Sequence, residues 1–212
     1  MTDPAALDPA LFAWLAARSI ARGVPLPVAS HGGYRVDTRS DTETARWVFA
    51  HAGPGLESLA RAIHAPRHFL KLCATPDVLH AALPPGWQIH PPGYFMIANA
   101  APPNQTPAPG YEIAIERRGA VTQVRITAAD GTPAASGYAA ETAEAFIYDR
   151  IETAPAHRRR GLGGAVMAAL HRAKRRQETP ELLVATEEGR ALYTTLGWRV
   201  LSPYSTASIP AT

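Results

Sequence analysis

Apolar side chains recur at helical spacing close to the amino end of the chain. Leu11 and Leu15 lie four residues apart, on one face of a predicted helix. Asp8 is typical of a helix start, and Gly23 is typical of a helix end. The pattern predicts a helix over about residues 8–22.

Short extended and helical patterns follow, separated by glycine and proline. Runs of apolar and β-branched residues predict strands at 34–37, 46–50, 69–73 and 94–98. Helical spacing predicts short helices at about 55–63 and 76–83. A polar turn at 39–41 favours pairing of the first two strands. This half of the chain carries no motif that indicates a chemistry.

The second half has longer and clearer patterns. Strand-like runs at 111–116, 121–128, 134–141 and 145–153 alternate with turn residues and predict an antiparallel meander. An apolar stripe at helical spacing then runs from Leu162 to Ala173. A buried strand, a helix and a further strand are predicted at 182–185, 187–196 and 198–201. The sequence shows no clear internal repeat.

A proline-rich stretch joins the two halves. Residues 101–110 contain four prolines, and such segments are extended and lack regular hydrogen bonding. We therefore expect a connector here and place a domain boundary in it. The predicted division is an N-terminal region of residues 1–105 and a C-terminal domain of residues 106–212.

The composition is that of an ordinary folded protein. Apolar residues make up 46% and charged residues 18% of the 212 residues, which excludes a highly charged disordered chain. Cys73 is the single cysteine, so an intramolecular disulfide and a cysteine-cluster metal site are excluded, and no metal is expected. The lone thiol fits a reducing cytoplasm.

The sequence predicts neither a secretory signal nor a membrane helix. Its amino end lacks a basic segment followed by a long apolar run. Residues 83–111 carry no charged side chain, but eight prolines interrupt them. We therefore expect a soluble, cytoplasmic protein without a membrane partner.

Positive charge is concentrated in one segment. The net charge of the chain is +3, yet residues 150–176 hold seven arginines and one lysine against a single acid, Glu152. Such a cluster favours a compact anion-binding site over an extended nucleic-acid surface. The segment also lacks the interleaved aromatic residues of many nucleic-acid binders. Nucleic acid is therefore not the expected partner.

The centre of this basic segment lies between a predicted strand and a predicted helix. It reads Arg158-Arg159-Arg160-Gly161-Leu162-Gly163-Gly164. Glycines let a ligand approach the backbone closely, and the first turn of a helix presents N–H groups and the positive end of its dipole. Arginines add attraction and bidentate contacts. The pattern predicts a phosphate or pyrophosphate site; its plain alternative is a solvated basic helix start.

Three other glycine motifs do not fit this spacing. A dinucleotide fingerprint needs a third glycine where the chain has Val166. The Gly-x-x-x-x-Gly-Lys-Ser/Thr loop of nucleotide hydrolases does not occur in the sequence. The Gly-x-Ser-x-Gly nucleophile elbow does not occur either. These exclusions leave a phosphate or pyrophosphate site and its plain alternative, a solvated basic helix start, both open.

A second motif follows the glycine turn. It reads Ala191-Leu192-Tyr193-Thr194-Thr195-Leu196-Gly197-Trp198. Together with the Arg158-x-x-Gly161-x-Gly163 turn, it resembles the GNAT superfamily of N-acetyltransferases, which use acetyl coenzyme A. The resemblance covers residues 121–200. It implies an α/β fold of the α+β type, with a mixed, mostly antiparallel central sheet flanked by helices, to which the first half adds an N-terminal α/β region.

The resemblance also implies roles for individual residues. Backbone amides of the turn would bind the coenzyme pyrophosphate; the residues concerned are Arg158, Arg159, Arg160, Gly161, Leu162, Gly163 and Gly164. The main chain of Ile151 and Thr153 would bind the pantetheine arm. An amine would attack the thioester directly, and Tyr193 would protonate the departing thiolate.

A base must also take a proton from the attacking amine, and carboxylates on the strand before the turn are the candidates. Glu152 and Asp149 lie three residues apart, so on a regular strand their side chains face opposite sides. A bulge would change that relation. We prefer Glu152 and keep Asp149 as its rival, and a base elsewhere in the chain is also left open.

The sequence departs from the GNAT pattern at one place. Members of that superfamily have two helices between their first and second strands, and these helices line the acceptor pocket. Here only residues 116–120 separate the candidate strands. Either the helices lie upstream within residues 55–83, or the first half forms a different acceptor wall, such as a degenerate acetyltransferase-like lobe.

The expected function is transfer of an acetyl group from acetyl coenzyme A to an amine, with a small molecule as acceptor. Two rivals are a catalytically silent regulatory module that binds acyl coenzyme A and a nucleic-acid-binding protein that uses the basic helix. The sequence does not identify the acceptor, and it leaves a homodimer open.

Overall fold

The computed structural model describes residues 4–210. Its helices are α1 (Pro4–Arg22), α2 (Pro54–Ala62), α3 (Pro76–Ala81), η1 (Pro155–His157), α4 (Leu162–Arg172) and α5 (Glu187–Thr195). Its strands are β1 (Val28–Ser30), β2 (Gly33–Asp37), β3 (Ala45–Phe49), β4 (His68–Leu72), β5 (Gln88–Ile89), β6 (Gly93–Ala98), β7 (Tyr111–Arg118), β8 (Val121–Ala128), β9 (Pro133–Glu141), β10 (Phe146–Thr153), β11 (Glu181–Thr186) and β12 (Trp198–Ser208). Every helix and strand predicted from the sequence is present, and β1, β5 and η1 are additional.

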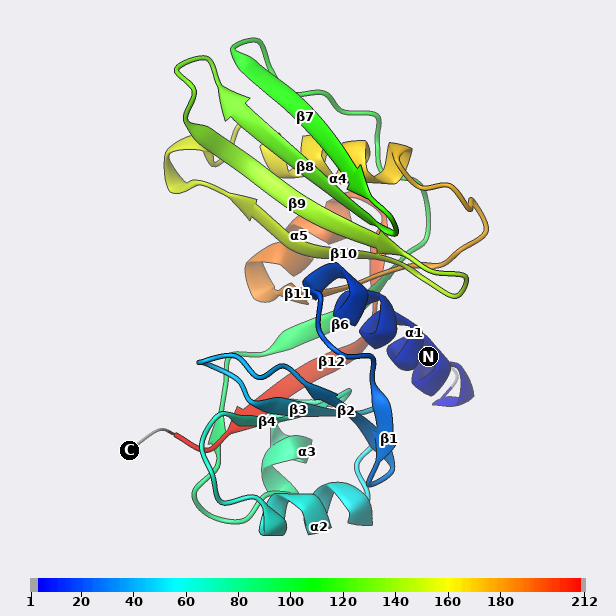
Figure 1. The fold of residues 1–212 in the computed structure, drawn as a ribbon, viewed down its shortest axis with the longest axis vertical. Helices are drawn as coiled ribbons and strands as arrows, with labels where there is room; N and C mark the ends of the chain where they lie inside the picture. Colours follow the sequence, from blue (N-terminus) through cyan, green and yellow to red (C-terminus); the bar gives the residue numbers. More distant parts are fainter. Residues whose placement is uncertain (1–3, 211–212) are drawn as a thin grey trace.

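The strands of the described chain form one continuous sheet (Figure 1). Its order is β1-β2-β3-β4-β12-β6-β11-β10-β9-β8-β7, and β5 pairs with β12 off this path. Within it, β3 runs parallel to β4 and β10 runs parallel to β11, whereas the other neighbours are antiparallel. The mixed, mostly antiparallel sheet with flanking helices confirms the fold class.

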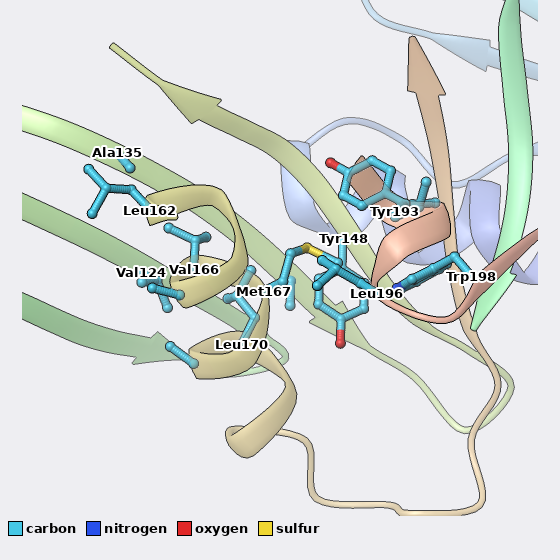
Figure 2. Packing of buried hydrophobic residues seen from close by; sticks show 14 of the residues in the cluster. Val124, Ala135, Tyr148, Leu162, Val166, Met167, Leu170, Tyr193, Leu196 and Trp198 are labelled. Carbon is cyan, nitrogen blue, oxygen red and sulfur yellow. The ribbon is translucent and has the colours of Figure 1, made fainter. Parts of the chain in front are cut away.

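The meander predicted for the second half is present. Strands β7, β8, β9 and β10 pair in chain order with antiparallel registers. Helix α4 packs on this meander with its apolar stripe, so that Val166 and Leu170 are fully buried in one cluster with Val124 (Figure 2). Each such aliphatic side chain contributes about 1.5–3 kcal/mol by leaving water, and this interface is the core of the half.

Strands β6 and β12 connect the two halves. Strand β6 belongs to the first half of the sequence, yet it pairs with β11 and with the first part of β12. The last part of β12 then pairs with β4 and β5. Each half of the sheet is therefore completed by a strand from the other half of the sequence (Figure 1).

The two parallel strand pairs have similar surroundings. In the first half, β3, α2, β4 and α3 follow one another, and β12 lies between β4 and β5. In the second half, β10, α4, β11 and α5 follow one another, and β6 lies between β11 and β12. The fold thus contains a repeat of topology that the sequence does not show, because strand order and direction leave no fixed residue pattern.

Helices α1 and α4 cover opposite faces of the meander. Side chains of neighbouring strand residues point to opposite faces, and on β9 Ala139 lies in the cluster of α4 whereas Ala140 lies in the cluster of α1. Among the described residues, no helix combines the length and the apolar character needed to cross a membrane.

The two helices that the GNAT resemblance places between its first two strands do not lie between β7 and β8. A tight turn at Gly119 joins β7 directly to β8. Helices α2 and α3 bury Leu56, Leu59 and Leu79 in a separate cluster of the first half. Helix α1 instead packs on β9 and β10, so it is the helix of the first half that lies against the strands of the second half.

Candidate active site

Strands β10 and β11 diverge soon after they begin. Their parallel register pairs Phe146 with Glu181 and Ile147 with Leu182, and the described ladder extends no further. Strand β10 continues to Thr153, so the later parts of the two strands separate toward their carboxyl ends. Main-chain N–H and C=O groups along such an edge need partners. A gap of this kind suits an extended ligand that lies between two strands.

A bulge reshapes β10 beside this gap. The register with β9 shifts between Asp149 and Glu152, and Arg150 has a left-handed φ of 53°. A bulge inserts an extra residue and re-aims the side chains around it. Both Asp149 and Glu152 border the same cleft as a result, although on a regular strand they would face opposite sides.

The glycine turn presents the amino end of α4 to the cleft. Gly161 has a left-handed φ of 74°, and the first backbone bond of the helix runs from Ala165 N to the Gly161 carbonyl at 3.1 Å. The amides of the three residues between them have no carbonyl partner within the helix. These N–H groups and the helix dipole favour a phosphate at this position.

The three arginines of the turn are placed differently. Arg158 and Arg159 are exposed and line the cleft. Arg160 instead donates a hydrogen bond of 2.7 Å to the Tyr111 hydroxyl on β7, and the same hydroxyl lies 3.1 Å from Nδ1 of His157. Two of the arginines can therefore meet an anion in the cleft, whereas Arg160 attaches the turn to the meander.

The missing side chain of Gly163 keeps the turn open. A β-carbon on Gly163 would lie 3.2 Å from Cδ2 of Leu192 and 3.9 Å from Oγ1 of Thr153. Thr153 is the last residue of β10, and Leu192 lies on α5. The turn, the strand end and α5 thus lie close together at the edge of the cleft, and a larger side chain at position 163 would press against α5.

Gln105 of the proline-rich connector closes the outer side of the turn. Its Nε2 donates a hydrogen bond of 2.9 Å to the Gly161 carbonyl. A β-carbon on Gly164 would lie 2.1 Å from Oε1 of Gln105. The connector is therefore part of the site's support, a role that its composition did not reveal.

Tyr193 lies at the edge of the core and borders the cleft. It is 7% exposed, and its ring centroid lies 6.0 Å from that of Trp198. Figure 2 shows its hydroxyl directed away from Trp198. Burial raises the pKa of Tyr193 to about 12. The hydroxyl therefore keeps its proton at neutral pH, as a general acid must.

These features border one cleft of about 1690 Å³. It extends from the glycine turn along the diverging strands to α1 and to the first half of the chain. The residues at that far end are Trp14, Arg18, Arg22, Lys71, Tyr204 and Thr206. Both halves of the chain therefore form the walls of the cleft.

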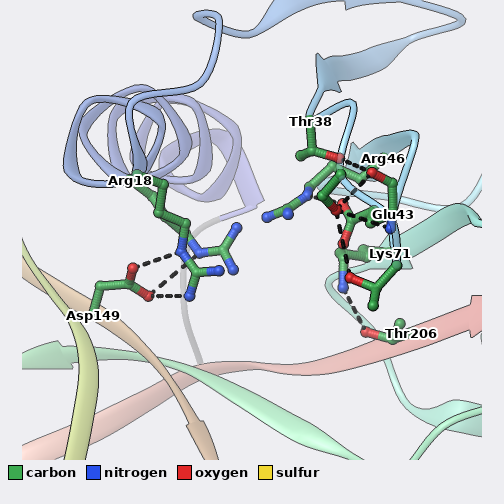
Figure 3. A network of polar contacts seen from close by, with 10 residues as sticks. Arg18, Thr38, Glu43, Arg46, Lys71, Asp149 and Thr206 are labelled. Carbon is green, nitrogen blue, oxygen red and sulfur yellow. Dashed lines mark hydrogen bonds and ion pairs between the residues drawn. The ribbon is translucent and has the colours of Figure 1, made fainter.

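Asp149 is neutralised by arginines at the junction of α1 and β10 (Figure 3). Arg22 donates hydrogen bonds of 2.6 and 2.8 Å to its two carboxylate oxygens, and Arg18 lies 3.6 Å away. Burial alone would raise the pKa of Asp149, but the hydrogen bond from Arg22 and the nearby positive charges lower it. Such a carboxylate holds its charge and is a weak base, whereas Glu152 is exposed in the cleft.

The matching turn in the first half is closed. Gly53 precedes α2 and Gly55 lies in its first turn, as Gly161 precedes α4 and Gly163 lies in the first turn of that helix. A β-carbon on Gly55 would lie 1.9 Å from the carbonyl oxygen of His31, in the turn between β1 and β2. That turn occupies the space that a ligand would need, so the repeat of topology does not bring a second open site at this position.

Comparison with known proteins agrees with this geometry. Residues 134–206 match the family model described as FR47-like protein. The structure is similar to that of a GCN5-related N-acetyltransferase from Kribbella flavida, with 15% identity, 97% of this chain and 96% of that chain covered, and a TM-score of 0.66. The chain has the GNAT fold. The resemblance drawn from the two sequence motifs is thereby confirmed.

Two further GNAT-fold structures align over nearly the whole chain. A GCN5-related N-acetyltransferase from Sphaerobacter thermophilus shares 14% identity over 99% of this chain and 94% of that chain, with a TM-score of 0.55. A tandem GNAT protein from the clavulanic acid biosynthesis pathway shares 14% identity over 98% of this chain and 96% of that chain, with a TM-score of 0.54. No curated protein has a matching sequence. At these identities the likeness is one of fold.

Sequence reasoning found one end of the site and missed the other. The glycine turn, the strand before it and Tyr193 were predicted, and all of them border the cleft. Arg18, Lys71 and Gln105 were not predicted. They lie far from the motifs in the sequence, and no local pattern indicates that the fold brings Arg18 and Lys71 to the cleft and Gln105 to the glycine turn.

Proposed function

We propose that this GNAT-fold protein transfers an acetyl group from acetyl coenzyme A to an amine of a small molecule in the cytoplasm. The observation that supports the proposal is a single cleft bordered by the diverging strands β10 and β11, the open amino end of α4 and Tyr193. Each of these parts suits a different portion of a thioester carrier: the extended arm, the diphosphate and the sulfur.

The residues present fit such a carrier. Amides at the start of α4, with Arg158 and Arg159 beside them, would hold the diphosphate. The edge of β10 at Ile151 and Thr153 would bind the extended arm by main-chain hydrogen bonds, as a neighbouring strand does. When bound, acetyl coenzyme A supplies an acyl group activated as a thioester.

The chemistry then needs one proton acceptor and one proton donor. Glu152 takes a proton from the ammonium form of the acceptor, which frees the nitrogen lone pair. The amine attacks the acyl carbon, and a main-chain N–H of β10 stabilises the developing oxyanion. The C–N bond forms, the C–S bond breaks, and Tyr193 gives its hydroxyl proton to the sulfur. The second proton lost by the nitrogen as the amide forms then restores the Tyr193 hydroxyl. Because the protein holds the amine beside the thioester, the acyl group can pass directly to the amine without a covalent enzyme intermediate.

The proposal is tested by thiol release with a panel of primary amines, combined with calorimetry of coenzyme A binding. We expect acyl transfer by the wild type and binding of the coenzyme near the glycine turn. Glu152→Gln is expected to lower kcat by about 10²–10⁴-fold with little change in coenzyme affinity. Tight binding without turnover of any amine would contradict catalysis and favour the silent regulatory module.

A further inference from the structure

The cleft has a second chemical feature, at the end away from the glycine turn. Arg18 comes from α1 and Lys71 from β4, 53 residues apart in the sequence, and both line the cleft. Figure 3 shows the groups around them facing each other, with the Asp149 cluster on one side and the Glu43 and Lys71 cluster on the other. These two cations are the starting point for an inference about the acceptor.

Arg18 has donor capacity that the protein does not use. Its side chain is 17% exposed, and its guanidinium lies 5.4 Å from the centroid of the Trp14 ring. Arg22 takes both oxygens of Asp149, which leaves Arg18 with a 3.6 Å contact to that carboxylate. Within residues 4–210, no hydrogen bond from the Arg18 side chain is recorded. A planar guanidinium in this state is ready to bind a carboxylate in bidentate fashion.

The ammonium group of Lys71 also has donor capacity that the protein does not use. Its Nζ lies 3.4 Å from Oγ1 of Thr206, a long hydrogen bond, and 5.3 Å from the Phe69 ring centroid. Burial, opposed by Glu43 and assisted by Arg18 and Arg22, lowers the pKa of Lys71 to about 8. An anion placed against Lys71 would stabilise its charged form.

The charges at this end of the cleft do not balance. Asp149 is shared by Arg18, Arg22 and Arg150. Glu43 is paired with Arg46 and is the carboxylate that acts on Lys71. Four of these cations line the cleft, namely Arg18, Arg22, Arg150 and Lys71, and Asp149 is the carboxylate beside them, whereas Glu43 and Arg46 are not part of the lining. Buried charge without a partner is unfavourable, so this end of the cleft favours an anion.

We propose that the acceptor is a primary amine that also carries a carboxylate, which Arg18 and Lys71 bind while the amino group points along the cleft toward Glu152. This inference rests on the proposed function for the amine, but the anion site itself does not. Tyr204, 5% exposed and on the same cleft wall, adds an aromatic surface beside the two cations. Polycationic amines are expected to be poor acceptors because they meet repulsion here.

The first experiment compares matched acceptors. Thiol release is measured for ω-amino acids of increasing length and for the corresponding amides, which lack the negative charge. We expect kcat/KM to favour the acids by about tenfold or more, as the loss of a hydrogen bond to a charged group predicts. Equal rates for acids and amides, or a preference for polyamines, would overturn the inference.

Variants of the two cations test whether Arg18 and Lys71 cause the preference for acids over amides. Arg18→Gln and Lys71→Met are each expected to bring the acid-to-amide ratio close to one while coenzyme affinity stays unchanged. Arg61→Gln removes a positive charge from an exposed helix of the first half, where the side chain is 63% exposed, and is expected to keep the wild-type ratio. If Arg18→Gln fails to fold, Lys71→Met decides alone. An unchanged ratio in the folded variants would refute the assignment.

A binding measurement separates this inference from the proposed function. Calorimetry with glutarate, which cannot accept an acetyl group, is expected to detect binding to the wild type and to Arg61→Gln but not to Lys71→Met. If no amine is acetylated and glutarate still binds in this manner, the transferase proposal fails and the anion site is supported. If amines are acetylated and glutarate does not bind, the anion site is overturned and the transferase proposal is supported.

Discussion

Arg22 of α1 donates hydrogen bonds of 2.6 and 2.8 Å to the two carboxylate oxygens of Asp149 on β10. The two residues are 127 positions apart in the chain. The contact fixes a helix from the first half to the bulged part of the strand that borders the cleft. It therefore fixes the distance between α1 and the bulged part of β10 across the cleft.

Asp149→Asn is expected to lower the free energy of unfolding by about 1–3 kcal/mol, because the arginines around it lose their charged partner. The pKa of Asp149 is below its usual value in the folded protein. Its contribution is thus complete above the unfolded pKa near 3.8 and is lost as the pH falls through the folded value. Urea unfolding at neutral and strongly acidic pH measures both effects.

The matched control for Asp149 is Glu57→Gln. Glu57 is 49% exposed and lies 3.9 Å from Arg61, so its removal is expected to change stability by less than about 0.5 kcal/mol. If Asp149 were the catalytic base instead, Asp149→Asn would abolish acyl transfer even where the variant is fully folded. Retained kcat at neutral pH would exclude that role.

Tyr193→Phe is expected to reduce kcat by about 10²-fold or more, because no other hydroxyl is assigned to protonate the leaving sulfur. The ring stays in place, so coenzyme affinity and unfolding free energy are expected to remain close to those of the wild type. Since burial raises the pKa of Tyr193 to about 12, its deprotonation does not limit the wild-type rate below that pH. Steady-state kinetics across pH, with calorimetry as the control, tests this role.

Gly163→Val is expected to weaken coenzyme binding by about tenfold or more, because a branched side chain enters the narrow approach to the α4 amides. Calorimetry with coenzyme A measures it. A β-carbon there would lie 3.2 Å from Cδ2 of Leu192, so the double variant with Leu192→Ala relieves that contact. Affinity that returns in the double variant would show that the effect came from displaced α5 and not from the blocked turn.

Lys71 gives the stability of the protein a specific pH dependence. Its pKa is about 8 when folded and near 10.5 in an unfolded chain, so the unfolded chain binds more protons between these values. The free energy of unfolding therefore gains a contribution that grows from about pH 8 to about pH 10.5. The charged or titratable groups that act on Lys71 or are affected by it are Arg18 and Arg22 of α1, Glu43 before β3, and His90 after β5.

Lys71→Met removes this contribution, which urea unfolding of both proteins at several alkaline pH values measures. The chain has one other lysine, Lys174, and it provides the control. Its Nζ forms an ion pair of 3.0 Å with Glu181, so Lys174→Met is expected to destabilise the protein while keeping the rise above pH 8. A parallel pH dependence in wild type and Lys71→Met would contradict the prediction.

Local patterns predicted the second half of the fold well. The four strands of the meander and the stripe from Leu162 to Ala173 follow from alternation and helical spacing, which depend on neighbours in the chain. The stripe nevertheless misled at its end. The stripe runs to Ala173, but α4 ends at Arg172, and the side chain of Lys174, the residue after the stripe, is 3% exposed and paired with Glu181.

Long-range pairing was the part that the sequence did not reveal. Only residues 198–201 were predicted as a strand, whereas β12 extends to Ser208. Serine, threonine and Pro203 give its second part little strand signal, and it is held there by β4 and β5. The same reason hid the far end of the cleft, since Arg18 of α1 and Lys71 of β4 are brought to it by tertiary packing of elements that are distant in the sequence.

The path of β12 has a consequence for how the protein comes into being. A ribosome makes this strand after all the others, yet the parallel pair near the amino end needs it as a neighbour. Until β12 has been synthesised, the edge of β4 in that pair lacks its main-chain hydrogen-bond partner. Cutting the proline-rich connector in the gene would accordingly yield two fragments, each lacking a strand held by the other, and co-expression would be required to restore either.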